Sequence, residues 1–256
     1  MRAMKALVLE RDKELRFTDV PDLVRPGPGW ARIRIALSGI CNSDIHRGFG
    51  GGAYRYPLVM GHEFSGLVEE PAAGGKVPRG ARVTVFPLIP CRRCVPCQTG
   101  DFAQCTDYDY LGSRRDGAFA EAVWAPDENL FVLPEATSLR DAALTEPCAV
   151  ALHGVSKLAI RPGDAGAVFG AGPIGNMAAQ WMRLRGCAEV FVVDIDGTKL
   201  DLAAADQHLY AAKEAGRNRV QGERRAADPL RRKVSTGRPD RGTTGAARPS
   251  RPAPKV

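Results

Sequence analysis

The sequence predicts a mixed β and α/β fold in three consecutive parts: a β-rich domain over residues 1–150, the first half of a parallel α/β domain over residues 151–205, and a tail over residues 206–256. Short segments of alternating polarity between turn residues, typical of antiparallel strands, fill the first part. Apolar strand-like segments and helix-like segments alternate in the second part. The tail holds only six residues of the larger apolar types (Val, Ile, Leu, Met, Phe, Trp and Tyr), so we expect it to be disordered.

The β-rich part begins with a strand pair, residues 4–10 and 15–20, around the polar turn 11–13. Further strands are expected over residues 31–36, 63–69, 82–87, 118–124 and 129–133. Thr137 or Ser138 can cap a helix, because a side-chain oxygen there accepts a free backbone N–H of the first turn. A second helix is expected over residues 147–158.

In the α/β part, residues 166–169 and 188–193 form short apolar segments, as expected for strands that are buried on both faces. Helical segments over residues 174–185 and 197–205 follow them. This order predicts the start of a parallel sheet with crossover helices.

Composition and charge exclude several classes of protein. Of the 256 residues, 44% are hydrophobic and 25% are charged, as in globular proteins. No apolar run approaches the roughly 20 residues of a membrane helix, and the N-terminus lacks the features of a secretory signal, so we expect a cytoplasmic protein with no membrane partner. The net charge of +7 comes from the tail, which has 13 Lys and Arg against 5 Asp and Glu. A nucleic-acid partner would depend on that tail alone and is not expected, because the tail lacks interleaved aromatic residues.

Four cysteines fall within one short segment with the spacing C-x2-C-x2-C-x7-C: Cys91, Cys94, Cys97 and Cys105. Four thiolates on one loop can enclose a tetrahedral Zn²⁺ and leave no open coordination position, which predicts a structural zinc site. An iron–sulfur cluster is the alternative for four cysteines.

A second set of candidate ligands is dispersed along the chain: Cys41, His62 with Glu63, and Glu146. A thiolate, an imidazole and a carboxylate supply the three protein ligands of a catalytic zinc, whose fourth position stays open for water or substrate. Near Cys41, the Ser43 hydroxyl could take a proton from a zinc-bound alcohol, and His46 could pass it to solvent. Taken singly, these residues are equally compatible with ordinary core and turn positions.

The glycine-rich motif Gly170-Ala171-Gly172-Pro173-Ile174-Gly175 follows an expected strand and opens an expected helix, and Asp194 ends the next strand. This context is that of a dinucleotide-binding site, in which the pyrophosphate lies at the helix N-terminus. The carboxylate of Asp194 would accept hydrogen bonds from the adenosine ribose and repel a 2′-phosphate, which favours NAD over NADP. The alternative is a glycine-rich turn that only packs the helix on the strand.

In this order, Gly61-His62-Glu63, the four-cysteine segment and the glycine-rich motif resemble the zinc-dependent medium-chain alcohol and polyol dehydrogenases. Within that family, residues 87–91 and 110–117 are similar to galactitol-1-phosphate 5-dehydrogenases and related sugar-alcohol-phosphate enzymes. The resemblance covers about residues 1–205.

The resemblance implies a GroES-like catalytic domain followed by a Rossmann domain. It also implies a catalytic zinc on Cys41, His62 and Glu146, with Glu63 close to the metal, and a proton relay through Ser43 and His46. The implied reaction is hydride transfer to NAD from a secondary hydroxyl of a polyol or polyol phosphate, and the implied assembly is a homo-oligomer.

Arg114 and Arg115 are candidates for a substrate phosphate, because guanidinium groups bind phosphate oxygens in pairs, although both could be solvated loop charges. Two other functions stay open: a sorbitol-, butanediol- or threonine-type dehydrogenase, and a zinc-binding fragment without turnover. Family members continue with further Rossmann strands that residues 206–256 do not resemble. We therefore expect a truncated or shifted reading frame near residue 205.

Overall fold

The computed structural model describes residues 3–214, with side chains described as far as Ala205. The last described helix, α6 (Gly197–Glu214), begins where the sequence predicts a helix and continues past residue 205, where the tail was expected to begin. The rest of the predicted tail, residues 215–256, lies outside the described residues. Within the described part of the chain, none of the helices combines the length and the apolarity needed to cross a membrane.

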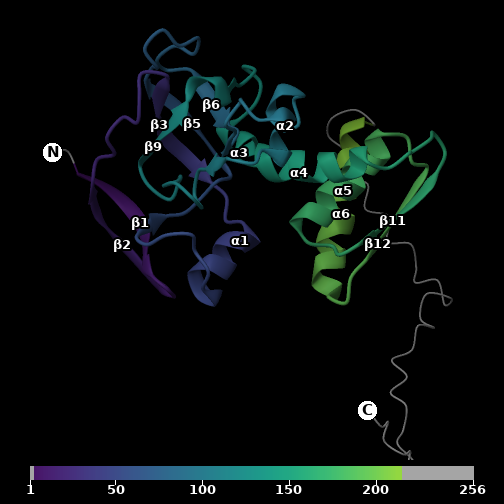
Figure 1. The fold of residues 1–256 in the computed structure, drawn as a ribbon. Helices are drawn as coiled ribbons and strands as arrows, with labels where there is room; N and C mark the ends of the chain where they lie inside the picture. Colours follow the sequence, from purple (N-terminus) through teal and green to yellow (C-terminus); the bar gives the residue numbers. More distant parts are fainter. Residues whose placement is uncertain (1–2, 215–256) are drawn as a thin grey trace, which may run out of the picture. The chain divides into compact units, whose positions relative to one another are not determined.

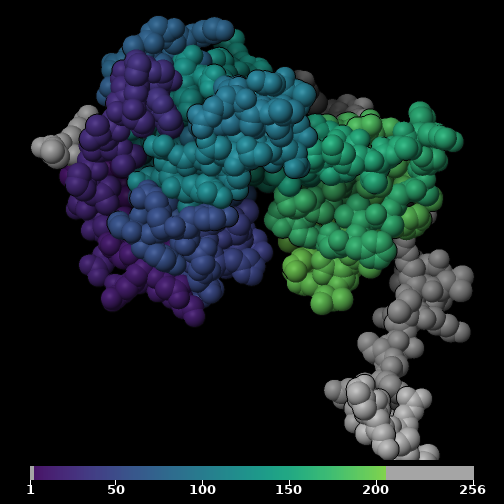
Figure 2. All heavy atoms as spheres, viewed as in Figure 1, coloured from purple at the N-terminus to yellow at the C-terminus, as the bar shows by residue number. Residues whose placement is uncertain are grey.

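The expected N-terminal strand pair is confirmed as an antiparallel hairpin of β1 (Ala3–Arg11) and β2 (Glu14–Pro21). A third strand, β4 (Leu58–Val59), pairs with the other edge of β1 in the order β2-β1-β4. β4 was not predicted, because two residues are too few to show a period. The hairpin lies at the surface, in purple in Figure 2, and Phe17 of β2 is exposed.

A five-stranded antiparallel sheet, in the order β10-β6-β5-β3-β9, forms the centre of the β-rich part (Figure 1). The strands are β3 (Trp30–Ser38), β5 (Phe64–Glu70), β6 (Arg82–Val85), β9 (Ala122–Pro126) and β10 (Leu130–Val132), close to the expected segments. Their alternate apolar side chains, among them Ile33, Phe64, Val68, Val83 and Val123, pack into one buried cluster. This cluster is the main core of the β-rich part.

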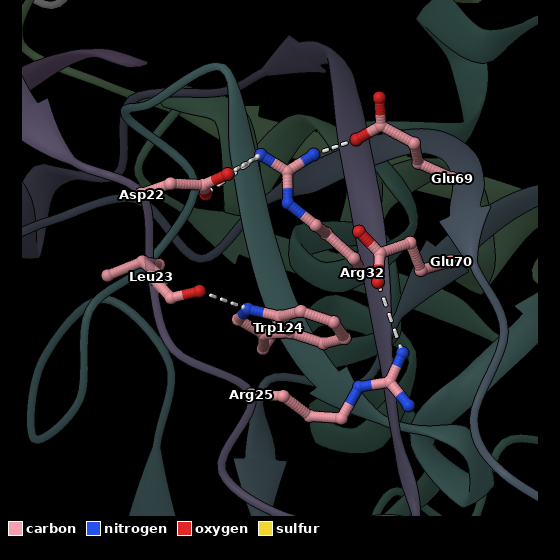
Figure 3. A network of polar contacts seen from close by, with 7 residues as sticks. All are labelled: Asp22, Leu23, Arg25, Arg32, Glu69, Glu70 and Trp124. Carbon is pink, nitrogen blue, oxygen red and sulfur yellow. Dashed lines mark hydrogen bonds and ion pairs between the residues drawn. The ribbon is translucent and has the colours of Figure 1, made fainter. Parts of the chain in front are cut away.

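A network of salt bridges and hydrogen bonds connects the segment after β2 to this sheet (Figure 3). The buried guanidinium of Arg32 lies between the carboxylates of Asp22 and Glu69. Beside it, Arg25 stacks over the ring of Trp124 at 4.7 Å and pairs with Glu70 at 3.2 Å. The indole Nε1–H of Trp124 donates to the carbonyl of Leu23 at 2.8 Å.

The connections between the strands hold short elements that the sequence did not predict. They are α1 (Asn42–Ile45), the π-helical turn η1 (His46–Gly50), the strands β7 (Leu88–Ile89) and β8 (Asp109–Tyr110), α2 (Val95–Gln98), and the 3₁₀ turns η2 (Phe102–Gln104) and η3 (Asp127–Asn129). The four-cysteine segment lies between β7 and β8, which pair with each other. Ser138 caps α3 (Leu139–Ala142), and its hydroxyl accepts the N–H of Asp141, as one of the two expected caps.

The predicted β-α-β order of the second part is confirmed. β11 (Ala165–Phe169) and β12 (Glu189–Val193) pair in parallel, and α5 (Pro173–Leu184) crosses between them. The preceding helix α4 (Thr145–Ser156) packs against α5 through a cluster of Val155, Met182 and Cys187. The fold class is therefore the mixed β and α/β fold that the sequence predicts.

Candidate active site

The four cysteines between β7 and β8 converge. One sulfur from each of Cys91, Cys94, Cys97 and Cys105 lies within 4.8 Å of all the others. The sulfurs of Cys94 and Cys105 are 3.9 Å apart, close to the roughly 3.8 Å edge of a tetrahedron with metal–sulfur bonds of about 2.3 Å. The donor set and its size therefore fit one Zn²⁺.

Backbone N–H groups around these thiols prepare them for a cation. N–H groups of Thr106 and Cys97 lower the pKa of Cys94 to about 6. Burial raises the pKa of Cys105, but N–H groups of Cys91 and Asp107 outweigh it and lower the pKa overall; the Cys91 N–H lies 3.2 Å from its sulfur. Burial, with the neighbouring thiols, raises the pKa of Cys97 to about 12. Four thiols so close together cannot all lose their protons easily. A bound metal ion would remove this difficulty, because it replaces the protons of all four thiols.

The second cluster comprises Cys41, His62 and Glu63, whose ligand atoms also lie within 4.8 Å of one another. Cys41 is the N-cap of α1, and His62 and Glu63 directly precede β5. His62 and Glu63 are buried, at 5% and 7% exposure. A thiol, an imidazole and a carboxylate at this spacing fit a Zn²⁺ site with three protein ligands.

Glycines fix the backbone that presents His62. Gly61 has φ +95°, and its carbonyl accepts the N–H of Ala118 at 2.9 Å. Gly112 and Gly117 pack so closely on this carbonyl that a Cβ on either would lie 2.3 or 2.1 Å from its oxygen. The loop before His62 is therefore held against residues 112–118 by close backbone contact.

A buried carboxylate orients the imidazole. Nδ1 of His62 lies 3.4 Å from Oδ1 of Asp44, which is 2% exposed. The other Asp44 oxygen accepts the N–H of Cys41 at 3.1 Å. Burial lowers the pKa of His62, but the charge and hydrogen bonding of Asp44, with smaller contributions from Glu146 and Glu63, outweigh it and raise the pKa. Asp44 thus hydrogen-bonds to the backbone of Cys41 and faces Nδ1 of His62, an atom without a hydrogen bond among the described residues, while Arg47 also donates to Oδ1 of Asp44 at 3.3 Å.

Glu146, which the resemblance placed in the ligand set, lies in the first turn of α4 and is not a member of the three-residue cluster. Its Oε1 instead accepts the hydroxyl of Tyr110 at 3.3 Å. Burial raises the pKa of Glu146; the positive charge of His62 opposes this effect, and the charge of Glu63 adds to it. The structure thus groups Glu63 with Cys41 and His62, and leaves Glu146 beside them.

The expected relay residues lie on α1 and η1. The hydroxyl of Ser43 interacts with the Cys41 thiol and accepts a hydrogen bond from Arg47 at 3.4 Å. Burial raises the pKa of Cys41 despite this interaction with Ser43. His46 is exposed to solvent at the start of η1.

The glycine-rich motif joins β11 to α5 as predicted. Gly170 has φ +105°, Gly172 is the N-cap of α5, and Pro173 and Ile174 form its first turn. A Cβ on Gly175 would lie 1.8 Å from the carbonyl oxygen of Gly170, so only glycine fits there. Open space surrounds the Cβ position of Gly172.

Asp194 follows β12 and closes this loop. Its Oδ2 accepts the N–H of Ala171 at 2.7 Å, and its Oδ1 accepts the N–H of Asp196 at 2.9 Å. These bonds, that from Ala171 first, lower the pKa of Asp194. The residue therefore holds a negative charge at the expected ribose position and also fixes the loop.

The two arginines proposed for a phosphate lie in different surroundings. Arg115 forms a salt bridge with Asp109 at 2.7 Å and lies over the ring of Trp30 at 4.9 Å. Arg114 is exposed and lies between the rings of Tyr54 and Tyr108, at 4.4 and 4.5 Å. Of these two arginines, Arg115 pairs with a carboxylate, whereas Arg114 has no carboxylate partner among the described residues.

Sequence reasoning missed two residues of this site, Asp44 and Tyr110. Asp44 stands three residues after Cys41, a spacing that a short helical turn brings back onto the Cys41 N–H. That spacing was a usable signal. Nothing in the sequence around Tyr110 indicates its place in the site, because its partner Glu146 lies in another element.

Comparison with known proteins agrees with this geometry. Residues 27–135 match the model of the alcohol dehydrogenase GroES-like domain. The chain is 37% identical over 203 residues to galactitol 1-phosphate 5-dehydrogenase of Escherichia coli K12, covering 78% of this chain and 58% of that protein.

The solved structures agree as well. The crystal structure of galactitol-1-phosphate dehydrogenase from Escherichia coli superposes with a TM-score of 0.74 at 34% identity, over 82% of this chain and 65% of that one. A zinc-binding dehydrogenase of Sinorhizobium meliloti 1021, bound to NADP, has a TM-score of 0.75 at 35% identity, over 80% and 60% of the two chains.

Residues 27–135 thus form a GroES-like domain of the alcohol dehydrogenase type, and the chain is similar to the zinc-dependent medium-chain dehydrogenases. After the GroES-like domain, the chain continues with the parallel β11-α5-β12 unit. The chain spans about three fifths of the length of the relatives it matches.

Proposed function

We propose that this chain carries the catalytic domain of an NAD-dependent dehydrogenase that oxidises a secondary hydroxyl of a polyol or polyol phosphate to a ketone. The observation that carries the proposal is the convergence of Cys41, His62 and Glu63 in a buried cluster. Three ligands leave one coordination position for the substrate hydroxyl. A second Zn²⁺, on the four cysteines, is structural because its shell is closed.

Each residue of the cluster has a distinct task. Zn²⁺ in this site would supply Lewis-acid chemistry that lowers the pKa of a hydroxyl group. Asp44 holds the imidazole of His62 in place, because its carboxylate faces Nδ1. The Ser43 hydroxyl, next to Cys41, would accept the proton that leaves the substrate and at the same time give up its own proton to the exposed His46, which passes it to water.

The nucleotide is NAD in this proposal. Within the loop, the N–H groups of Gly170 and Ala171 are bonded to Val193 and Asp194. The first turn of α5, which has no side-chain cap, therefore supplies the N–H groups for the pyrophosphate. Asp194 carries a negative charge at the end of β12, where it accepts ribose hydroxyls and repels a 2′-phosphate. The Sinorhizobium structure holds NADP, so the preference for NAD depends on Asp194 and not on the family.

For the substrate phosphate, the geometry favours Arg114 over Arg115. Arg115 is engaged by Asp109 and Trp30. Arg114 lies against two tyrosine rings and donates one hydrogen bond to the Tyr108 hydroxyl, but it is exposed and pairs with no carboxylate among the described residues, so an anion can be its charge partner. Replacement of Arg114 by Gln is expected to raise KM for a polyol phosphate and leave KM for the free polyol unchanged.

We also propose that the protein is cytoplasmic and forms a homo-oligomer. All seven cysteines are free thiols, which suits a reducing compartment.

The decisive experiment measures metal content and turnover. Because the chain spans 58% of the curated relative, the assay uses both the chain and a chimera in which residues 1–205 precede the remaining segment of the Escherichia coli relative. The panel is galactitol 1-phosphate, sorbitol, 2,3-butanediol and threonine, with NAD⁺ and NADP⁺. We expect two Zn²⁺ per chain and a preference of the chimera for the polyol phosphate with NAD⁺.

The Cys41→Ser variant of the chimera is the matched control, and it should lose one Zn²⁺ and turnover together. A zinc-loaded chimera that oxidises none of the four substrates would refute the proposed reaction and favour a zinc-binding role alone. Preference for sorbitol, butanediol or threonine would refute the phosphate assignment.

A further inference from the structure

Tyr110 links the metal cluster to Glu146. It ends β8, and its ring meets the imidazole of His62 edge to face, with the ring centroids 5.8 Å apart and the planes at 69°. Its hydroxyl donates to Oε1 of Glu146 at 3.3 Å. One side chain thus contacts a candidate ligand through its ring and a neighbouring carboxylate through its hydroxyl.

The cluster has one more potential ligand than an open site can use. Cys41, His62 and Glu63 converge within 4.8 Å, and the side chain of Glu146 interacts electrostatically with both His62 and Glu63. A fourth protein ligand would close the tetrahedral shell, as in structural zinc sites, and would leave no position for a substrate. The position of Glu146 therefore decides whether the site is open.

Among the described residues, the hydrogen bond of the Glu146 side chain comes from Tyr110, and the main positive charge acting on it is that of His62. On one side Glu146 borders a cavity of about 640 Å³ whose walls are mostly apolar, including Val85, Phe102 and Phe131. On the other side it meets the hydroxyl of Tyr110. A partly buried carboxylate needs a hydrogen-bond donor or a cation, so the phenol and a metal ion are alternative partners for it.

We infer that the hydroxyl of Tyr110 holds Glu146 outside the ligand set and so keeps the fourth coordination position open for substrate. The inference rests on the proposed function, because it assumes a metal on Cys41, His62 and Glu63. Tyr110 is then a positioning residue: it acts through Glu146 and does not itself bind the metal.

The experiment compares the full chain with its Tyr110→Phe variant, which keeps the ring against His62 and removes only the hydroxyl. The four-cysteine site is first filled with Zn²⁺ and the second site with Co²⁺, whose visible spectrum reports the number and type of its ligands. The same preparation of Cys41→Ser supplies the blank. Zn²⁺ affinity at the second site is measured in parallel by competition with a chelator.

In Tyr110→Phe, Glu146 should enter the shell, change the Co²⁺ spectrum and tighten Zn²⁺ binding about tenfold. The double variant Tyr110→Phe/Glu146→Gln should restore the spectrum of the parent chain. Tyr108→Phe, which alters a phenol that contacts Arg114, is the matched control and should leave the Co²⁺ spectrum and the Zn²⁺ affinity of the second site unchanged.

Two results would overturn the inference. One is a Co²⁺ spectrum that is unchanged in Tyr110→Phe. The other is a loss of Zn²⁺ affinity by 10- to 100-fold, the usual effect of losing an outer hydrogen-bond partner of a ligand. Neither readout needs turnover, so the inference and the proposed reaction can fail independently.

Discussion

The Nδ1 atom of His62 lies 3.4 Å from Oδ1 of Asp44, while Oδ2 of the same carboxylate accepts the N–H of Cys41. One buried carboxylate therefore hydrogen-bonds to the backbone of one candidate ligand and faces the imidazole of another, although the two ligands are separated along the chain. Carboxylates that bond to a metal-binding histidine typically contribute 10- to 100-fold to metal affinity.

The Asp44→Asn variant should accordingly bind Zn²⁺ at the Cys41–His62–Glu63 site about tenfold more weakly, because the amide carries no charge to orient and polarise the imidazole. Chelator competition measures the affinity. Asp19→Asn, on an exposed strand pair with Lys5, serves as the control and should leave it unchanged. An Asp44→Asn chain with parental affinity would show that Asp44 only caps α1.

The four-cysteine site should be independent of the second site. Its ligands lie within 15 residues of each other, and N–H groups of neighbouring residues already hold the thiols. Cys94→Ser should lose one of two Zn²⁺ in elemental analysis and reduce soluble expression, because a metal ion held by four residues of one loop contributes to the folding of that loop. Cys148→Ser, outside both clusters, should retain both ions. Two Zn²⁺ in Cys94→Ser would contradict a four-sulfur site.

The network of Figure 3 contains one buried arginine, Arg32, and one half-buried arginine, Arg25. Arg32 has a side-chain exposure of 9% and pairs with Asp22 and Glu69, which are partly exposed. Arg32→Met should lower the free energy of unfolding by about 2 kcal/mol, less than for a fully buried pair because water reaches both carboxylates. Arg25→Met, in the more exposed pair with Glu70, should cost about 1 kcal/mol or less. Urea denaturation measures both, and equal effects would refute the distinction.

The residues that the sequence located correctly carry their signal locally. The cysteine spacing predicted a convergent cluster, and Pro173 after Gly172 predicted the start of α5. The sequence could not predict that Glu63 lies within 4.8 Å of the Cys41 and His62 ligand atoms while Glu146 stays outside that group, because this depends on how α4 and the loop before β5 meet in three dimensions. The strands β4, β7 and β8 were missed because two residues show no alternation.

Two glycines of the nucleotide loop should respond differently to alanine. A Cβ on Gly175 would overlap the carbonyl of Gly170, whereas the Cβ position of Gly172 is open. Gly175→Ala should therefore destabilise the fold by about 1–3 kcal/mol and weaken NADH binding. Gly172→Ala should leave stability unchanged and weaken NADH binding alone, because its Cβ would occupy the space that the pyrophosphate approaches. Thermal unfolding and NADH fluorescence separate the two effects, and a stable Gly175→Ala chain would contradict the contact.

Asp194 should have two separate effects. Its charge should determine the choice of nucleotide, and its two hydrogen bonds should fix the shape of the loop. Asp194→Asn removes the charge and keeps one carbonyl acceptor for the N–H of Ala171, so the preference for NADH over NADPH should narrow by tenfold or more. Asp194→Ala also frees the N–H groups of Ala171 and Asp196, so both nucleotides should bind more weakly than in Asp194→Asn. Titrations of both variants in the chimera, read by nucleotide fluorescence, test this order. If Asp194→Asn kept the parental ratio of the two affinities, the carboxylate would serve only to hold the loop.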